Sequence, residues 1–181
     1  RRLDEAEAWF FLGDRLVRQG RPEPALAAFE RSHALRPGAA STINALVAVY
    51  AGLKRPRAAL RLLERQPVAA DWLAQRGTLH LELNEPARAL ACSDEAVCLS
   101  PMHFAARLNR GAALRALGRN AEVLENDKTL VRCHPRHPMA LYNLGDALLL
   151  NGEDEEALSV LAEALTLVPG APQIRIAHCL A

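Results

Sequence analysis

The chain has 181 residues, of which half are hydrophobic and only 4% are aromatic. This is enough apolar material for a buried core and excludes a disordered chain, and the abundance of alanine and leucine favours an all-α fold over a sheet. The 22 Lys and Arg nearly balance the 21 Asp and Glu, so the overall charge predicts neither nucleic acid nor a membrane surface as a partner.

The sequence has no run of about 18 apolar residues, which a membrane-spanning helix would need. The amino end, RRLDEAEAWF, lacks the apolar core of a signal peptide, so a cytoplasmic location is expected. The chain does not begin with Met, however, and a removed leader or an excised fragment would give the same amino end. Four cysteines form no CxxC pair, and reduced, mostly buried thiols are expected.

Helix-forming segments alternate with short breaks along the chain. A helix of about 14 residues is followed by a break, such as 18–22 or 150–154, and by a second helix that a proline ends. The pattern predicts five helix pairs, in chain order at residues 6–36, 40–66, 70–100, 104–134 and 138–168. Residues 172–181 are predicted to start an eleventh helix.

A glycine within the first helix of each pair recurs at a fixed spacing. Gly77, Gly111 and Gly145 are 34 residues apart, and each is followed by a proline 24 residues later. Gly13 precedes Gly77 by 64 residues, four short of two periods, and the spacing of matching alanines places the deletion after Ala59. Four residues are about one helical turn, so the second repeat is predicted to be one turn shorter.

The recurring residues resemble the signature of the tetratricopeptide repeat (TPR) family. They are Trp9, Leu12, Gly13, Leu16, Ala25, Phe29 and Pro37 in the first repeat, and Leu141, Leu144, Gly145, Leu148, Ala157, Leu161, Ala164 and Pro169 in the last. The chain departs from the family pattern at Ser93 and Asp127, where a large apolar residue is usual. The resemblance implies one TPR domain over residues 1–181, a right-handed α-solenoid with repeats at 6–39, 40–69, 70–103, 104–137 and 138–171.

The glycine inside each first helix requires an explanation, because it costs about 1 kcal/mol relative to alanine. We interpret it as a place where the second helix crosses closely. The small residue facing the glycine is expected to be the alanine twelve residues later, as in Ala25, Ala89 and Ala157.

The resemblance also implies that the first helices line a concave groove. Three consecutive repeats carry an amide two residues before the glycine, namely Gln75, Asn109 and Asn143. A column of amides can hydrogen-bond the backbone of an extended peptide without reading its side chains. It is similar to the asparagine ladder of O-linked N-acetylglucosamine transferase-like proteins. The alternative is that the amides are solvated or cap neighbouring helices.

Asp71, Thr78 and Asp146 complete the predicted ligand-binding set. The acidic groove positions outnumber the basic one, Arg18, by five to one, which favours a neutral or basic extended segment of a protein or peptide. These acidic positions are Glu7, Asp14, Asp71, Glu82 and Asp146. The Lys and Arg clamp with which some TPR domains bind the acidic tails of heat-shock chaperones is not found.

Catalytic and metal-binding patterns are not recognisable. The stretch CHPRH at 133–137 offers three zinc ligands but is followed by no second pair, so no metal site is predicted. There is no nucleophile elbow, no glycine-rich loop after a strand and no HExxH, so neither catalytic residues nor a cofactor are expected in this chain.

Three functions remain open: a protein–protein interaction scaffold, the recognition arm of a larger enzyme such as a glycosyltransferase, and a self-associating structural protein. Solenoids need polar terminal caps, whereas residues 172–181 include Ile174, Ile176 and Leu180. A homodimer formed through this uncapped helix, or a further repeat or domain beyond Ala181, is therefore expected. In the latter case a longer chain should have a higher thermal midpoint.

Overall fold

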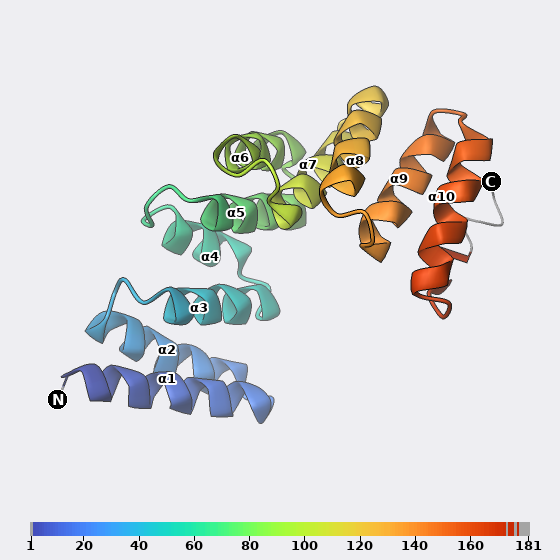
Figure 1. Ribbon diagram of the computed structural model, residues 1–181. Coiled ribbons are helices and arrows are strands. Elements are labelled where there is room, and N and C mark those ends of the chain that lie inside the picture. Colours follow the sequence, from blue (N-terminus) through green and yellow to red (C-terminus); the bar gives the residue numbers. More distant parts are fainter. Residues whose placement is uncertain (1, 173, 176, 178–181) are drawn as a thin grey trace. The chain divides into compact units, whose positions relative to one another are not determined.

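The computed structural model describes residues 2–172, 174, 175 and 177, and every element in this part of the chain is a helix (Figure 1). The ten helices are α1 (Arg2–Arg18), α2 (Pro22–Leu35), α3 (Ala40–Gly52), α4 (Pro56–Leu63), α5 (Ala70–Glu82), α6 (Pro86–Leu99), α7 (Phe104–Ala116), α8 (Asn120–Cys133), α9 (Pro138–Leu150) and α10 (Asp154–Leu167). Each odd-numbered helix packs on the helix that follows it. The predicted all-α fold of five helix pairs is confirmed.

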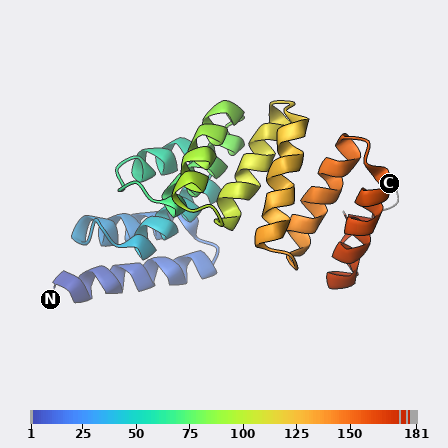
Figure 2. The ribbon, with the colours of Figure 1, turned by 45° about the horizontal axis from the view of Figure 1, so that its top comes forward.

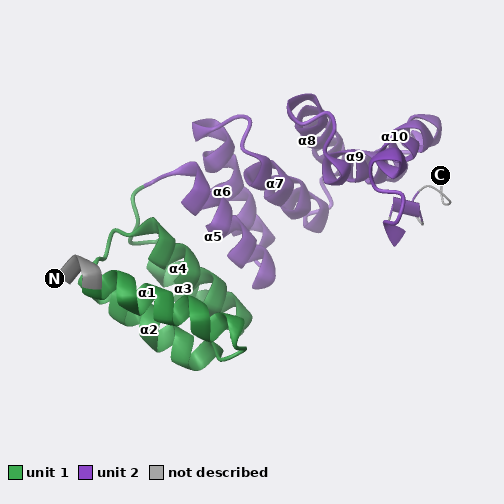
Figure 3. Cartoon of the chain, turned by 60° about the horizontal axis from the view of Figure 1, so that its bottom comes forward, with its two compact units in different colours: residues 1–67 green, residues 68–181 purple. Residues whose placement is uncertain are grey.

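The helices form two compact units, coloured separately in Figure 3. Unit 1, Arg1–Pro67, contains α1 to α4, and unit 2, Val68–Ala181, contains α5 to α10. Within unit 2 the hairpins stack, since α7 packs on α5, α6 and α8, and α8 packs on α9. Figure 2 shows the last two hairpins, yellow to red, side by side. No helix in the described part of the chain combines the length and apolarity that a membrane crossing requires.

The turn inside each helix pair contains one residue with positive φ. These residues are Gly20 (φ 70°), Lys54 (58°), Asn84 (57°), Gly118 (71°) and Gly152 (77°). They are spaced by 34 residues except between Lys54 and Asn84, where the spacing is 30. The four-residue deletion therefore lies within this interval, and α4 accordingly has 8 residues where α2 has 14. Glycine adopts positive φ without strain, whereas a residue such as Lys54 incurs a cost of about 1–2 kcal/mol.

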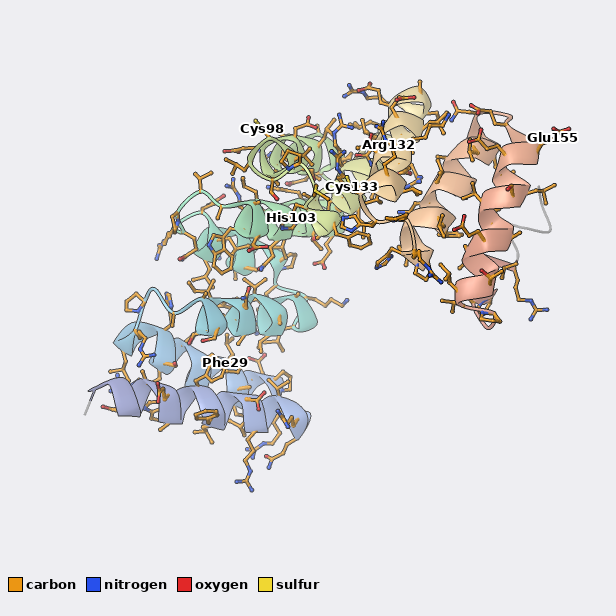
Figure 4. All side chains as sticks on the ribbon, in the orientation of Figure 1. Phe29, Cys98, His103, Arg132, Cys133 and Glu155 are labelled. Atoms are coloured by element: carbon orange, nitrogen blue, oxygen red, sulfur yellow. The ribbon has the colours of Figure 1, made fainter. Side chains whose placement is uncertain are left out.

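The glycines within first helices make room for the side chain sixteen residues later. A Cβ on Gly13 would lie 2.6 Å from the ring of Phe29, and one on Gly145 would lie 2.5 Å from Leu161. Phe29 is labelled in Figure 4 on α2, where its ring faces α1. The close approach of the two helices was correctly predicted, but the residue that faces the glycine was not. The alanines twelve residues after the glycine are fully buried, yet the closest side-chain atoms belong to the later residue.

The two departures from the family pattern occupy this same crossing position. A Cβ on Gly77 would lie 3.1 Å from Ser93 Oγ, and one on Gly111 would lie 3.0 Å from Asp127 Oδ1. Both polar side chains are fully buried. Unit 2 therefore places polar groups at two of its three hairpin crossings.

Leucine, valine and alanine dominate the buried hydrophobic residues between the helices. In unit 2, one cluster joins α6, α7, α8 and α9 through Leu90, Leu114, Val123 and Leu148. Each such side chain contributes about 1.5–3 kcal/mol when fully buried.

The predicted eleventh helix, 172–181, lies only partly within the described residues. Ile174 and Ala177 are helical and buried, and they belong to the same cluster as Leu161 and Ala164 of α10. The described part of this segment therefore covers the apolar side of the last complete repeat.

The described cysteines are free thiols, as predicted. Cys92 is buried, which raises the pKa of its thiol. Cys98 is exposed at the end of α6, and Cys133 is half-buried at the end of α8. The expectation that the thiols are mostly buried is therefore wrong for Cys98, because it lies on the solvent side of its helix.

Candidate functional site

The six predicted ligand-binding residues lie on the first helices of the three repeats of unit 2. Asp71, Gln75 and Thr78 belong to α5, Asn109 to α7, and Asn143 and Asp146 to α9. The structure links some of them across adjacent repeats, and the three amides have different environments.

The amide of Asn109 binds the neighbouring repeat. Its Nδ2 donates to the carbonyl oxygen of Ala74 at 2.7 Å and to Thr78 Oγ1 at 2.9 Å. Thr78 Oγ1 also donates to the Ala74 carbonyl, at 3.3 Å. The Asn109 amide nitrogen therefore ties α7 to α5, and the Oδ1 atom, which takes no part in these two bonds, is the one that could accept a hydrogen bond from a ligand.

Asn143 occupies the same repeat position as Asn109 but has another environment. Its side chain is half-buried and forms no hydrogen bond with any residue that the structure describes. The reason is visible in the sequence, because the residue equivalent to Thr78 in the preceding repeat is Ala112, which has no hydroxyl. Gln75 is also half-buried and is engaged within the protein.

A charged cluster around one buried carboxylate joins α7, α8 and α9, and sequence reasoning missed it. Arg115 on α7 lies 2.6 Å from Asp127 on α8 and 3.2 Å from Asp146 on α9, and it donates to the backbone oxygen of Asn143 at 2.9 Å. Asn126 donates to Asp127 Oδ1 at 2.9 Å. The missed signal was Asp127 at an apolar position of the repeat, since a fully buried carboxylate requires a cation nearby.

Burial raises the pKa of the Asp127 carboxyl above its ordinary value. The nearby Arg115 charge and the hydrogen bonds from Asn126 and Arg115 act in the opposite direction, and Asp146 adds to the increase. The desolvation of Asp127 is the largest of these effects.

Asp71 accepts a hydrogen bond from a histidine of the next repeat. His103 Nε2 lies 2.9 Å from Asp71 Oδ1, while His103 Nδ1 accepts the backbone N–H of Ala106 at 3.1 Å and caps α7. Because Nδ1 is an acceptor, the ring proton is on Nε2 and the ring is neutral. Asp71, whose side chain is 84% exposed, therefore keeps its negative charge uncompensated at the surface.

The acidity of the groove positions is weaker than counting predicts. Of the five acidic residues, three pair with an arginine and one with a neutral histidine, and two of the three arginines, Arg36 and Arg115, lie outside the counted positions. The pairs are Glu7 with Arg36, Asp14 with Arg18, Asp71 with the neutral His103, and Asp146 with Arg115. Glu82 forms no ion pair with any residue in the described part of the chain.

The histidines of the CHPRH stretch pack against an aromatic ring. The Phe104 ring centroid lies 5.0 Å from that of His134 and 4.1 Å from that of His137. His134 Nε2 lies 3.0 Å from the backbone oxygen of Met102. Among the residues that the structure describes, no three His, Cys, Asp or Glu side chains are grouped so as to hold a metal ion.

Two hollows were not foreseen from the sequence. One of about 510 Å³ lies in unit 1, where Ala45, Ala48 and Gly52 of α3 leave space beside Asp14 and Val17 of α1. The sequence signal was the run of small residues on one side of α3. The other, of about 440 Å³ in unit 2, is mostly apolar and is lined by His137, Pro138, Met139, Tyr142, Val168, Ala171 and Ile174.

The chain is similar to known repeat proteins. Models of the tetratricopeptide repeat match residues 6–39, 74–122 and 123–172. A stretch of 71 residues is 44% identical to the TPR repeat-containing thioredoxin TTL4 of Arabidopsis thaliana, covering 39% of this chain and 10% of that protein. The matched stretch thus spans about a tenth of the length of this curated relative.

Solved TPR structures have the same fold. YrrB, described as "a TPR protein with an unusual peptide-binding site", is 24% identical with a TM-score of 0.70, covering 93% of this chain and 89% of that one. A thermophilic TPR protein of Thermus thermophilus is 21% identical with a TM-score of 0.73, covering 97% of each chain. Family models match more than half of the residues, and the helix pairs keep the repeat spacing, so the chain belongs to the tetratricopeptide repeat family.

Proposed function

We propose that this chain is a protein–protein interaction scaffold, and that the first helices of unit 2 bind an extended, neutral to basic segment of a partner protein. Asn143 and Asn109 Oδ1 would hydrogen-bond the backbone of that segment. Asp71, Asp146 and Glu82 would attract its basic side chains. Gln75 and Thr78 complete the proposed surface.

The observation that carries this proposal is the state of Asn143. Its amide is half-buried on the first-helix face and makes no hydrogen bond to the described residues, although asparagine is a poor helix former. An extended peptide offers alternating N–H and C=O groups, which are the groups that an amide can pair with.

The charge around Asn143 supports the basic preference. Asp71 remains negative and highly exposed, and unit 2 as a whole contains 14 acidic and 10 basic residues. Arg115 offsets part of the charge of Asp146, so the attraction should be moderate and should weaken with added salt. The peptide-binding site ascribed to YrrB, another TPR protein, agrees with a role of this kind.

The test separates recognition from stability. Partner segments recovered by pulldown and identified by mass spectrometry are synthesised, and their affinity is measured by titration calorimetry. Asn143→Ala should weaken binding by roughly fivefold, the equivalent of one hydrogen bond, without lowering the thermal midpoint, because alanine is the better helix former. Asn120→Ala, an exposed amide on α8, is the matched control and should bind like the unaltered protein.

Asn109→Ala is a less suitable probe, because it removes two hydrogen bonds between α7 and α5 and should also lower the thermal midpoint. If Asn143→Ala retains full affinity for the recovered segments, the proposed site is wrong.

A second candidate is the recognition arm of a larger enzyme. It is favoured by the relative whose name joins TPR repeats to a thioredoxin, of which the matched stretch covers 10%. In that case catalysis would lie outside residues 1–181, and the sequence of the complete gene decides the matter. For the third candidate, self-association through 172–181, light scattering with and without these residues is the test.

We further propose that the two units fold as one TPR domain in the cytoplasm. A single cooperative unfolding transition followed by two independent probes would support one domain. Two separate transitions would contradict it.

A further inference from the structure

Exposed cations gather around α4 in unit 1. They are Lys54 in the turn before the helix, Arg57 and Arg61 on the helix, and Arg65 in the turn after it, which together we name the α4 basic patch. All four side chains are exposed, and none forms an ion pair with a residue that the structure describes.

The acidic groups of neighbouring helices are engaged elsewhere. Glu23 pairs with Arg55 at 2.9 Å, and Glu30 accepts a hydrogen bond from the Tyr50 hydroxyl at 2.8 Å. Burial together with this bond raises the pKa of Tyr50 to about 12. Neither carboxylate therefore forms a bond with the patch.

Cations outnumber carboxylates in the patch, where Glu64, also exposed, is the one acidic residue between Lys54 and Arg65. Arg57 and Arg61 are four residues apart, so they lie on one face of α4, opposite the buried Ala59, Leu60 and Leu63. Like charges at this spacing repel each other. A bound anionic group would relieve that repulsion.

Lys54 adds a second, independent observation. The equivalent turn residue is glycine in three of the five repeats, and Lys54 adopts the same positive φ with the strain that a side chain brings. The chain thus keeps a cation beside α4 at a position where glycine would fit better. Strain of this kind is more common at functional positions.

The charges of the two units differ in sign. Unit 1 contains 12 basic and 7 acidic residues, whereas unit 2 contains 10 basic and 14 acidic residues. The near-neutral total of the chain therefore conceals a basic region that includes the α4 basic patch. This patch is on the second helix of a pair in unit 1, whereas the first-helix face proposed above to bind an extended segment belongs to unit 2.

We propose that the α4 basic patch docks a short acidic segment of a partner protein. The helix within it has 8 residues, about 12 Å, which matches a run of a few Asp or Glu side chains. A long polyanion such as nucleic acid fits less well, because it would extend far beyond a patch of this length.

The experiment measures the binding of a fluorescently labelled, glutamate-rich peptide of roughly 12 residues by anisotropy, with a glutamine version of the peptide as its control. The double substitution Arg57→Gln with Arg61→Gln should weaken binding by roughly fivefold. The matched control, Arg15→Gln with Arg31→Gln, removes two exposed unit 1 cations that lie on α1 and α2, and should change the affinity by less than about twofold. Equal losses in the two double variants would overturn the proposal.

Lys54→Gly separates docking from folding. It should raise the thermal midpoint, because it removes strain, and yet weaken peptide binding. Asn84→Gly removes the backbone strain of the equivalent turn in unit 2, and it should raise the thermal midpoint without changing the affinity for the peptide. Unchanged binding by Lys54→Gly would count against the patch.

Two further measurements test the class of partner and the site. A single-stranded oligonucleotide that binds more tightly than the peptide and depends on Arg57 and Arg61 would overturn the choice of an acidic protein segment. If Asn143→Ala no longer binds the acidic peptide, the peptide's binding site lies on the first-helix face of unit 2 and not on the α4 basic patch. If the α4 proposal alone fails, the proposal that the first-helix face of unit 2 binds an extended segment still stands.

Discussion

Units 1 and 2 are built from the same helix pair but place their polar groups differently. In unit 1 the first hairpin crosses through Gly13 and the Phe29 ring, and unpaired cations remain outside, around α4. In unit 2 polar groups enter the hairpins, at Ser93 and at Asp127.

The contrast shows that aromatic, aliphatic, hydroxyl and carboxylate side chains can each face the glycine, and that the one carboxylate among them has a cation beside it. The last hairpin of unit 2 returns to the apolar form, with Gly145 against Leu161. Polar and apolar hairpin crossings therefore both occur within the stacked repeats of unit 2.

The largest effect should come from the buried ion pair. Arg115→Met leaves the buried carboxyl of Asp127 without its cation, which should lower the free energy of unfolding by about 3–5 kcal/mol in urea titrations. Combining it with Asp127→Leu recreates the apolar crossing of Gly145 and Leu161 and should restore most of the loss. If the double variant is no more stable than Arg115→Met, the two crossings are not interchangeable.

Alanine substitution of the crossing glycines should have a smaller effect on stability, and one that differs between the apolar and the polar crossings. Gly13→Ala brings a methyl group within 2.6 Å of Phe29 and should cost about 1–3 kcal/mol of unfolding free energy. Gly77→Ala meets Ser93 Oγ at 3.1 Å and makes ordinary contacts with Asn109 Nδ2 at 3.4 Å and the Ala89 carbonyl oxygen at 3.6 Å. It gains about 1 kcal/mol of helix propensity, so its stability should stay close to that of the unaltered protein. Thermal melts compare the two, and similar losses would contradict this account.

Acid titration should reveal the buried carboxyl of Asp127. Its folded pKa is raised above the ordinary 3.8, so its contribution to stability is fully present below that pH and is lost as the pH rises through the folded pKa. Asp127→Asn cannot ionise. The stability of the unaltered protein relative to this variant should therefore fall as the pH rises above 3.8, by about 1.4 kcal/mol for each pH unit that separates the ordinary pKa from the folded one. Urea unfolding across the acidic range measures this, and a difference independent of pH would contradict it.

The smallest effect concerns the two strained turns. Lys54→Gly should stabilise the protein by about 1 kcal/mol, and Asn84→Gly by less, because asparagine tolerates positive φ better than lysine. Differential scanning calorimetry measures both. A destabilised Lys54→Gly variant would show that the lysine side chain makes a contact that outweighs its backbone strain.

The sequence predicted the helix pairs because the 34-residue spacing is repeated by glycines, prolines and turns, and the four-residue deletion preserves the turn geometry. It did not predict which residue meets the glycine, since the angle at which two helices cross decides that contact. It also treated Asn109 and Asn143 as equivalent. They differ because Thr78 offers the first a hydroxyl, whereas Ala112 offers the second none.

The charges near the groove were misjudged for a related reason. Counting considered the residues of one helix face, whereas Arg115 reaches Asp146 from the adjacent repeat. The repeat spacing assigns each residue to a helix face, but a long side chain can reach a residue of the adjacent repeat.

Arg115 has a mechanical consequence for unit 2. By bonding α8 through Asp127 and α9 through both Asp146 and the Asn143 carbonyl, a single guanidinium spans the boundary between two repeats. The last hairpin should thus detach only when the one before it loosens as well. Backbone amides of α8 and α9 should exchange their hydrogens for deuterium as one cooperative block rather than fraying inward from the carboxyl end.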